Sequence, residues 1–350
     1  MTSMMNLPGP TALSRLVATQ RQPAPTDLHP PVSVFMAIRD EEAGLAESVR
    51  RVFAQDYAGE IELVLAVAPS VDSTWGLALE LALREPRLRL VENPDLFTPH
   101  GLNAAIAAAS HDYLIRVDGH AFIPLDYVSR IVEVLRTTGA ANVGGRMVPV
   151  GDGPVSEAVA VSMSSRFGIG GGAFHVGGEA GEQPTVYLGA FRRDALASVG
   201  GYDETFLRAQ DWELNHRLRT AGHQVWFDPS IGVTYRPRSD WRSFARQQFR
   251  TGGWRRRVIG EHPGTVSARY LAPPVAVVVI VLGVLLAAQA PLLAGWLLIG
   301  LAAPLGYLAA ITALGLHEGR RHPWHVRRRV PVAMALMHLS WGIGFLFRAR

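Results

Sequence analysis

Apolar and polar residues follow two alternating periods between residues 32 and 117. Four short apolar runs have the length and composition of buried strands: 32–38, 61–68, 88–93 and 113–117. Three intervening stretches place apolar residues at helical spacing: 41–55, 73–85 and 98–110. Because strands and helices alternate along the chain, the pattern predicts an α/β fold with a doubly wound, mostly parallel sheet.

The fourth run is followed by a candidate ligand site. Asp118 and His120 come directly after "YLIRV", and ligands of doubly wound sheets bind beyond the carboxyl ends of the strands. A carboxylate and an imidazole in this position suit magnesium or manganese held jointly with substrate phosphates. Alternatively, Asp118 caps the turn and His120 is a surface residue. The spacing alone does not decide between these interpretations.

Two later segments combine charge with helical periodicity. In "LRAQDWELNHRL", residues 207–218, Asp211 stands at the start of an amphipathic helix, where it is either a first-turn acid or a general base. "RQQFRTGGWRRR", residues 246–257, is either a basic collar beside a membrane or a clamp for an anionic substrate. "GIGGGA", residues 168–173, fits a dinucleotide-binding pattern, but it does not follow a first strand, which favours a mobile loop.

The C-terminal region is apolar enough to enter a membrane. Residues 270–316 contain no charged residue, which is about twice the length of one crossing, and a turn is expected around Gln289. A buried helical hairpin is the alternative, which the length and the absence of charge disfavour. Residues 330–347 are also uncharged; they either cross once more, which we favour, or lie along the inner surface.

Arginines flank these spans and predict their orientation. Eight arginines lie in residues 236–257 and five in 317–329, and positively charged flanks remain in the cytoplasm. We therefore expect a multi-pass protein of the cytoplasmic membrane whose residues before 265 face the cytoplasm. The basic clusters adjoin the spans, so they indicate membrane lipids and not nucleic acid as partners.

Composition limits the remaining possibilities. The 350 residues include no cysteine, which excludes disulfides, thiolate zinc sites and cysteine nucleophiles. The domain organisation that we expect has four parts: a poorly ordered, proline-rich segment (1–31), an α/β domain (32–235), a basic juxtamembrane segment (236–269) and a membrane domain of two to three helices (270–350).

Taken together, these motifs resemble the family 2 glycosyltransferases, nucleotide-sugar enzymes with a GT-A fold, and most of all their membrane-anchored exopolysaccharide branch of succinoglycan-type glucosyltransferases. The resemblance runs from about Pro31 to Arg257. "VSVFMAIRDEEAG" is similar to the family's first strand and loop, and "ELVLAVAPSVDST" to the second. The resemblance implies nucleotide-sugar contacts in this half of the domain at Ala37, Arg39, Glu41, Asp72 and Asn103.

The second half of the resemblance contains the residues implied to bind the metal, to act as the base and to contact the donor. "RVDGHA" stands where the family has Asp-x-Asp, which implies that Asp118 and His120 bind a divalent metal, Mn²⁺ or Mg²⁺, with Asp118 also near the nucleotide. "QDWELNHRL" is similar to the Glu-Asp motif, which makes Asp211 the implied base. "QQFRTGGWRR" resembles the Gln-x-x-Arg-Trp element, which implies donor contacts by Gln248, Arg250 and Trp254.

The sequence departs from the family pattern at three positions. Val67 replaces the aspartate that contacts the base, His120 replaces the second metal aspartate, and Gln210 replaces the first member of the Glu-Asp pair. Histidine still binds manganese or magnesium, so the metal site is altered in its ligand set. In addition, Arg192 and Arg193 lie between the two motifs and are candidates to neutralise phosphates; a solvated helix start is the alternative.

The resemblance implies an inverting glycosyltransferase. It would move a sugar from a nucleotide-diphosphate sugar to a lipid-linked or cell-envelope glycan at the cytoplasmic membrane face. Two alternatives remain at this point. One is a polyprenyl-phosphate sugar synthase, whose acceptor is the lipid phosphate; the other is a membrane-anchored binding protein without turnover. Retention of Asp118 and Asp211 favours catalysis.

Overall fold

The computed structural model describes residues 28–347 of the chain. The segment expected to be poorly ordered, 1–31, lies outside the described residues except for its last four. The chain divides into two compact units. The first contains residues up to Gly145 together with Gly181–Ile231, and the second contains Arg146–Ala180 together with the chain from Gly232 onward. The second unit thus includes a segment that the sequence division placed within the α/β domain.

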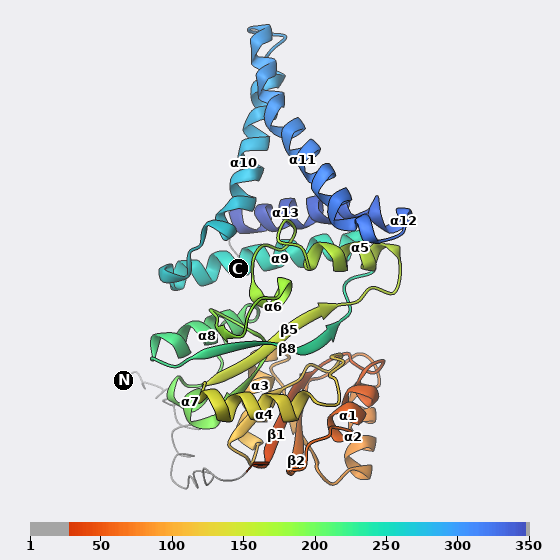
Figure 1. Ribbon diagram of the computed structural model, residues 1–350, viewed down its shortest axis with the longest axis vertical. Helices are drawn as coiled ribbons and strands as arrows, with labels where there is room; N and C mark the ends of the chain where they lie inside the picture. The colour runs from red at the N-terminus through yellow and green to blue at the C-terminus, as the bar shows by residue number, and fades with distance from the viewer. Residues whose placement is uncertain (1–27, 348–350) are drawn as a thin grey trace, which may run out of the picture. The chain divides into compact units, whose positions relative to one another are not determined.

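A mixed sheet forms the centre of the first unit (Figure 1). Its strand order is β3-β2-β1-β4-β7-β5-β8-β6, with β1 to β4 parallel and β7 antiparallel to both of its neighbours. The strands are β1 (Val32–Ile38), β2 (Ile61–Val67), β3 (Leu88–Glu92), β4 (Tyr113–Arg116), β5 (Asn142–Pro149), β6 (Gly181–Glu182), β7 (Tyr187–Arg192) and β8 (Val225–Tyr235). The α/β class and the mostly parallel sheet predicted from the sequence are confirmed.

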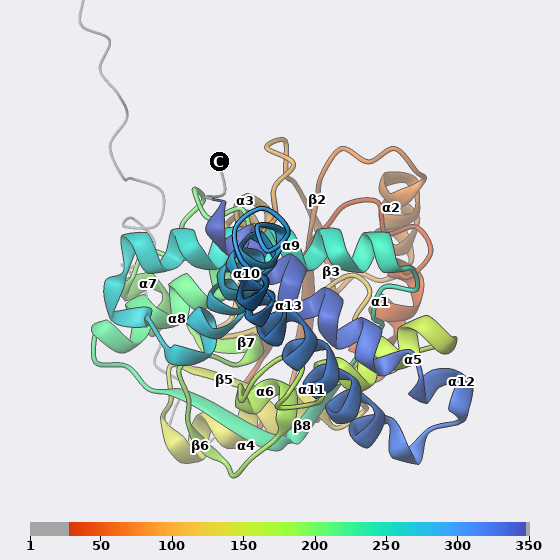
Figure 2. The same ribbon diagram turned by 90° about the horizontal axis from the view of Figure 1, so that it is seen from above.

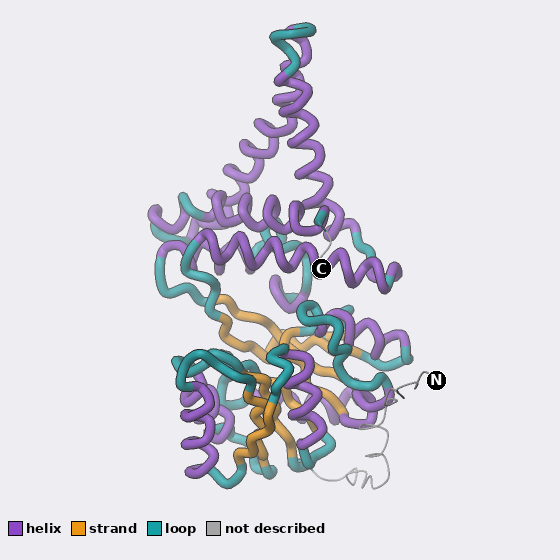
Figure 3. Tube along the Cα trace, turned by 180° about the vertical axis from the view of Figure 1, so that it is seen from behind, coloured by secondary structure: helices purple, strands orange, loops and turns teal. Residues whose placement is uncertain are grey.

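Helices cover both faces of this sheet, as Figure 3 shows for its orange strands. The helices of the first unit are α1 (Leu45–Phe53), α2 (Thr74–Arg84), α3 (Thr98–Ala108), α4 (Tyr127–Thr138), α7 (Arg193–Ser198) and α8 (Gln210–Thr220). α3 packs on β1, β2 and β3, and α4 lies on the opposite face (Figure 2). Because both faces are covered, β2 is buried along its whole length and is apolar at every position except Glu62.

The parallel register brings three strand ends to one edge. Val32 pairs with both Ile61 and Tyr113, so β1, β2 and β4 start level and finish close together. The loops that follow these strands carry the polar residues singled out above, beginning at Arg39, Asp72 and Asp118. The fold therefore gathers the candidate residues at the carboxyl edge of the sheet, as such sheets do.

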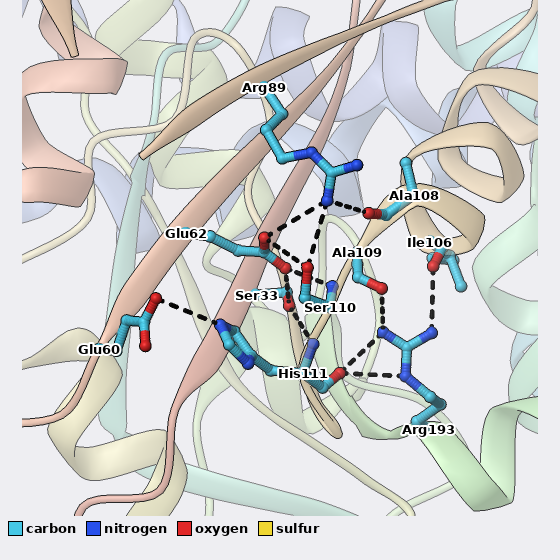
Figure 4. Close-up of polar contacts among 10 residues, drawn as sticks. All are labelled: Ser33, Glu60, Glu62, Arg89, Ile106, Ala108, Ala109, Ser110, His111 and Arg193. Carbon is cyan, nitrogen blue, oxygen red and sulfur yellow. Dashed lines mark hydrogen bonds and ion pairs between the residues drawn. The ribbon is translucent and has the colours of Figure 1, made fainter. Parts of the chain in front are cut away.

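The opposite, amino edge is fastened by a buried carboxylate (Figure 4). Glu62 accepts a hydrogen bond of 2.5 Å from the Ser33 hydroxyl, one of 3.0 Å from the Ser110 hydroxyl and another from the Ser110 backbone N–H. Arg89 lies 3.8 Å away. Burial opposes ionisation of Glu62, but the hydrogen bonds from Ser33 and Ser110 outweigh it and lower the pKa of this carboxyl. The cluster joins the beginnings of β1, β2 and β4.

We expect Glu62→Gln to destabilise the fold by about 1–3 kcal/mol, because a neutral amide leaves buried donors poorly matched. Since folding lowers this pKa, the stabilising contribution is present above the unfolded value of about 4.3 and is lost as the pH falls through the folded value. The difference in unfolding free energy between wild type and variant should therefore shrink in acid. Glu60→Gln is the matched control, since the Glu60 side chain is 69% exposed and lies 4.0 Å from His111. Equal stability of the two variants would contradict this assignment.

The second unit is helical. Its main helices are α5 (Pro154–Met163), α6 (Ala173–Val176), α9 (Trp241–Glu261), α10 (Ala268–Ala288), α11 (Ala302–Glu318), α12 (Trp324–Arg327) and α13 (Val330–Leu346). Three stretches are long and apolar enough to cross a membrane: Ala268–Ala288, Gly295–Arg321 and Trp324–Leu346. Figure 2 shows α10 nearly end-on, whereas α9 and α13 are seen along their lengths.

Glycines allow α9 and α13 to pack with their backbones in contact. A Cβ added at Gly252 of α9 would lie 2.0 Å from the carbonyl oxygen of Trp341, and one at Gly344 of α13 would lie 1.9 Å from that of Phe249. Neither position accepts even a methyl group without separating the helices. The last apolar helix therefore runs beside the arginine-rich helix that precedes the first candidate span (Figures 1 and 2).

Candidate active site

The turn after β4 is tightly held. The Ala121 N–H donates to the Asp118 carbonyl at 2.9 Å, and the Ser48 hydroxyl donates to the Gly119 carbonyl at 2.7 Å. A Cβ at Gly119 would lie 2.9 Å from Cγ2 of Ile38, so glycine is the residue that fits between the turn and β1. Packing against α1 and β1 thus fixes where the Asp118 carboxylate projects.

Arg116 joins the two aspartates that the sequence motifs singled out. Its guanidinium lies 3.0 Å from Oδ1 of Asp118 and forms a second ion pair with Oδ1 of Asp211. Only 6% of the Arg116 side chain is exposed. Burial acts to lower the pKa of Arg116, but Asp118 and Asp211 outweigh it and raise that pKa far above its ordinary value. The two motifs are 93 residues apart along the chain, and this arginine brings their carboxylates together.

Sequence reasoning did not identify Arg116 as a functional residue. The signal was nevertheless visible, because a single arginine stands within the apolar run "YLIRV". A charged residue in a buried strand requires a partner of opposite charge. Here the partners are the candidate base and the candidate metal ligand.

Asp211 lies in the first turn of α8. Ala209, just before the helix, has a φ of 61°, a left-handed conformation that is uncommon for a residue other than glycine. The Asp211 side chain keeps 38% of its surface accessible, yet the surrounding protein desolvates the carboxylate. This desolvation, together with the nearby Asp118 charge, exceeds the effect of Arg116 and raises the pKa of Asp211. A carboxylate with a raised pKa is a stronger base than an ordinary aspartate.

Tyr202 completes the buried side of this group. It is 2% exposed, and burial raises the pKa of its hydroxyl, against the opposing charge of Arg116 beside it. Asn103 positions the chain here: its side-chain oxygen accepts from the Tyr202 N–H at 2.9 Å, and its amide donates to the Tyr202 carbonyl at 2.8 Å. Asn103 thus lies near the site but is occupied in holding the Tyr202 loop.

His120 points to a different partner from the one expected. Its Nδ1 lies 2.7 Å from Oε1 of Glu41, which follows β1, and 54% of its side chain is exposed. Glu41 and His120, expected separately as a nucleotide contact and a metal ligand, are therefore neighbours. In the structure, the Asp118 carboxylate pairs with Arg116, and the His120 imidazole pairs with Glu41.

The loops after β1 and β2 are joined through Asp72. One carboxylate oxygen accepts from the hydroxyl and the N–H of Thr74, at 2.5 and 3.0 Å, and the other accepts from the Glu42 N–H at 3.2 Å. These bonds, led by the Thr74 hydroxyl, lower the pKa of Asp72. Asp72 therefore shapes the loop beside Glu41. Arg39 is largely exposed at this edge and lies 3.6 Å from Asp40.

Of the other expected residues, Ala37 lies within β1 and Arg192 lies at the amino edge of the sheet. Ala37 lies on β1, where a Cβ added to Gly101 of α3 would approach it to 2.9 Å. Arg192 pairs with Asp194 at 3.2 Å and donates to the Gly139 carbonyl at 3.0 Å. Because Arg192 is paired in register with Tyr113, the first residue of β4, it lies at the amino edge, away from Asp118.

Arg193 lies at the same amino edge (Figure 4). Its guanidinium donates to the carbonyls of Ile106, Ala109 and His111 at 2.8–3.2 Å, at the end of α3. Arg192 and Arg193, the candidates for neutralising substrate phosphates, are thus both engaged at the amino edge of the sheet, at the opposite end of β4 from Asp118.

Gln248, Arg250 and Trp254 belong to α9 in the second unit. Gln248 and Trp254 are buried there, whereas Arg250 is exposed. The guanidinium of Arg257 lies 5.2 Å from the centre of the Trp254 ring.

The residues of the turn fit a divalent cation that is shared with a substrate. Among the described residues, no three histidine, aspartate or glutamate side chains form a metal-binding group by themselves. Asp118 and His120 supply one carboxylate and one imidazole, and Glu41 adds negative charge beside the imidazole. A magnesium or manganese ion held by one or two protein ligands takes its remaining ligands from phosphates and water. This donor set therefore suits a metal–diphosphate complex better than a metal bound by protein alone.

The site combines a base, the Asp211 carboxylate, with a buried cation, the Arg116 guanidinium. Asp211 is a desolvated carboxylate at the carboxyl edge of the sheet, and Arg116 fixes its direction from below the surface. Asp118 lies on the same guanidinium, so negative charge gathers where the strand ends. Such a group can take a proton from a hydroxyl while the neighbouring turn holds an anionic ligand through a metal ion.

Comparison with known proteins shows which family this sequence matches. The sequence matches glycosyl transferase family 21 over residues 3–347. The succinoglycan biosynthesis protein ExoA of Rhizobium meliloti (strain 1021) is 33% identical over 81% of this chain and 84% of its own length. A dolichyl N-acetyl-alpha-D-glucosaminyl phosphate 3-beta-D-2,3-diacetamido-2,3-dideoxy-beta-D-glucuronosyltransferase of Methanococcus voltae is 24% identical over 63% of this chain and 71% of its own.

A solved structure confirms the fold. The mannosyltransferase PcManGT from Pyrobaculum calidifontis, in complex with GDP-Man and Mn²⁺, superposes with a TM-score of 0.59 at 19% identity, covering 96% of this chain and 92% of its own. The expected GT-A fold is thereby confirmed, and a divalent metal occurs in structures of this fold. The chain belongs to glycosyl transferase family 21 and is a glycosyltransferase of the family 2 type.

Proposed function

We propose that this glycosyltransferase transfers a sugar, with inversion, from a nucleotide-diphosphate sugar to a lipid-linked or cell-envelope glycan at the cytoplasmic face of the membrane. The observation that carries the proposal is the group formed by Asp211, Arg116 and Asp118, which puts a desolvated base beside the turn that stands in place of the family's Asp-x-Asp motif. A binding protein without turnover has no need of this base.

The reaction is a single displacement. Asp211 accepts the proton of the acceptor hydroxyl while that oxygen forms a bond to the anomeric carbon. The bond between the anomeric carbon and the diphosphate oxygen breaks, and its electron pair leaves with the nucleoside diphosphate. Arg116 holds Asp211 in place, and its charge opposes the rise in the pKa of that carboxyl. Attack from the face opposite the leaving group gives inversion.

Donor binding falls to the loops at the carboxyl edge. Glu41, Arg39 and Asp72 lie in the two loops after β1 and β2, where they would contact or shape the nucleotide site. Asp118 and His120 would hold a divalent ion, which when bound supplies positive charge to the leaving diphosphate. In the second unit, Gln248, Arg250 and Trp254 of α9 remain candidates for donor contacts.

Removing the metal should stop transfer. A chelator is expected to abolish activity, and added Mn²⁺ or Mg²⁺ to restore it, because the leaving diphosphate and Asp118 are both anionic and need a cation between them. His120→Ala should raise the metal concentration needed for half-maximal activity without lowering the melting temperature. His223→Ala is a suitable control, since His223 lies near Ser198 away from the site. Full activity in excess chelator would remove the metal from the proposal.

Two relatives support the acceptor class. The Rhizobium relative is a succinoglycan biosynthesis protein, and the Methanococcus relative is named for a dolichyl-phosphate-linked sugar. A polyprenyl-phosphate sugar synthase is the alternative, and it differs in its product, a sugar joined directly to lipid phosphate.

The test is a screen of radiolabelled nucleotide sugars with the full chain in membranes. We expect one donor to label a lipid-extractable glycan and to stabilise the purified protein against heat. A glycosidic bond in the product survives mild acid, whereas a sugar–phosphate bond to lipid is cleaved. Donor stabilisation without any transfer, in wild type and Asp211→Asn alike, would establish the non-catalytic alternative instead.

We also propose that α10 and α11 cross the membrane as a hairpin and that α13 lies along its inner surface, in place of the third crossing favoured from the sequence. Two observations support this. α13 packs on α9, and the α9 side chains Arg246, Arg250 and Arg256 are exposed. A helix bearing such arginines belongs at the membrane surface, and α13 is in backbone contact with it.

Introduced cysteines test this topology, because the chain has none of its own. Arg321→Cys and a cysteine added after Arg350 should both resist impermeant thiol reagents in intact cells. Leu293→Cys, in the turn between the two spans and 71% exposed, should be labelled from outside. Labelling at position 321 would overturn the orientation, and labelling only at the C-terminus would restore the third crossing.

A further inference from the structure

Two arginines of the second unit lie against the ring of Tyr270, in the first turn of the first candidate span. The guanidinium carbon of Arg255 lies 3.8 Å from the centre of the Tyr270 ring, and that of Arg269 lies 4.6 Å from it. Arg269 also donates to the Tyr270 hydroxyl at 2.5 Å. The two arginines are held on one aromatic ring although they carry the same charge.

Two further basic side chains lie beside glycines that flank α6: His175 of α6 near Gly172, and Arg146 of β5 near Gly177. A Cβ at Gly172 would lie 3.6 Å from Nη1 of Arg269 and 3.8 Å from Cδ2 of His175. A Cβ at Gly177 would lie 3.7 Å from the guanidinium of Arg146. We call Arg146, His175, Arg255 and Arg269 the cationic cluster. All four belong to the second unit.

Within the part of the chain that the structure describes, no carboxylate balances the positive charges of Arg146 and Arg269. There, neither Arg146 nor Arg269 has a carboxylate within 4.0 Å. Within the same residues, Nε of Arg146 and Nδ1 of His175 are buried and lack a hydrogen-bond partner. Buried donors without acceptors cost free energy, and clustered like charges add to that cost.

The pKa shifts of His175 and Arg255 also indicate an excess of positive charge at the cluster. Burial, reinforced by the charge of Arg269, lowers the pKa of His175 to about 3. Burial also lowers the pKa of Arg255 to about 10, and Arg269 contributes to that shift. Both shifts would be reversed by an anion placed among these side chains.

The position and the side chains indicate which anion. Arginines bind phosphate oxygens in pairs, and Arg269 stands where the chain enters the first apolar span. Next to the cluster, Val266 and Leu271 expose 48% and 40% of their surface. Gly170 and Gly177 have φ values of +87° and +82° and carry no side chain that would keep a ligand out. A lipid phosphate suits both features, because its phosphate would bind the arginines and its apolar chain would contact Val266 and Leu271.

We propose that the cationic cluster binds the phosphate or diphosphate of a polyprenyl-linked acceptor. This rests on the proposed function, since it names the part of the acceptor that the second unit recognises. The cluster binds the lipid end and takes no part in the displacement. Ordinary phospholipid headgroups and free phosphate share the same chemistry, and the test separates them.

The test measures binding without turnover, on the full chain in detergent. The probes are undecaprenyl phosphate, phosphatidylglycerol vesicles and inorganic phosphate, and the readout is the shift in melting temperature with probe concentration. We expect undecaprenyl phosphate to stabilise the wild type. Arg146→Gln and Arg269→Gln should each weaken that binding about ten- to one-hundred-fold, as expected for the loss of one charge-assisted hydrogen bond. Stabilisation by the nucleotide donor should be unchanged in both variants.

Arg246→Gln is the matched control, because Arg246 is an exposed arginine of α9. It should bind undecaprenyl phosphate as the wild type does. Wild-type affinity in both cluster variants would overturn the proposal, as would equal stabilisation by phosphatidylglycerol or by inorganic phosphate alone. The result is independent of the proposed function: arginine-dependent lipid binding without any sugar transfer would reject the function and keep the cluster, and normal transfer with unaffected lipid binding would do the reverse.

Discussion

Asp211→Asn should abolish sugar transfer while leaving donor binding almost unchanged. The substitution keeps the shape of the side chain and removes the proton acceptor, so the loss should be about 10²- to 10⁴-fold in turnover rate. The buried contact with Arg116 would weaken, because an amide oxygen carries less charge than a carboxylate. Transfer is measured with saturating donor, and donor binding by thermal stabilisation.

Asp194→Asn is the matched control for this experiment. Asp194 is 57% exposed, pairs with Arg192, and lies at the amino edge of the sheet. It should retain wild-type turnover. Near-normal turnover in Asp211→Asn would remove Asp211 from the mechanism, and a large loss of donor stabilisation in that variant would assign the residue to binding instead.

Arg116→Met should have the second largest effect, acting through the two aspartates. Without the guanidinium, Asp118 and Asp211 face each other with no cation between them, and like charges raise each other's pKa. Because Asp211 acts in its ionised form, the acid limb of the pH–rate profile should move to higher pH. We also expect a loss of about 3–5 kcal/mol in unfolding free energy, the cost of breaking a buried ion pair from one side.

The pH profile separates positioning from a general loss of fold. Arg116→Lys restores a positive charge, and it should return the acid limb toward its wild-type position while recovering only part of the rate. Arg130→Met serves as the control, because Arg130 is 45% exposed and pairs with Asp126, the residue just before its own helix. An unchanged acid limb in Arg116→Met would show that the arginine does not set the ionisation of Asp211.

The first half of the sheet was predictable because both of its faces are buried. The runs that begin at Val32 and Ile61 are apolar except for Ser33 and Glu62, and each forms the strand expected of it. β5 reads as "NVGGRMVP", in which two glycines and an arginine interrupt the pattern, so no comparable signal exists. Its place in the sheet depends on antiparallel pairing with β7, which lies about 45 residues further along the chain.

The candidate site was predictable in its residues but not in their pairing. Asp118 and Asp211 were found from strand ends and helix starts, which are local features. The link through Arg116 spans 95 residues to Asp211, and the contact of His120 with Glu41 spans 79. Such contacts follow from tertiary packing, and no period or spacing in one sequence specifies them. The same limit applies to α13, whose length permits a crossing and whose glycine contacts with α9 are visible only in three dimensions.

Those glycine contacts mean that the C-terminal region is not an interchangeable anchor. Gly252 and Gly344 admit the partner helix only because each lacks a side chain, so α9 is fitted to one particular neighbour. A chimera that kept residues 28–265 and borrowed its membrane hairpin from another protein would leave a strip of α9 backbone uncovered. A soluble truncation made by deleting the apolar tail would do the same. Any fragment that keeps α9 therefore has to keep α13.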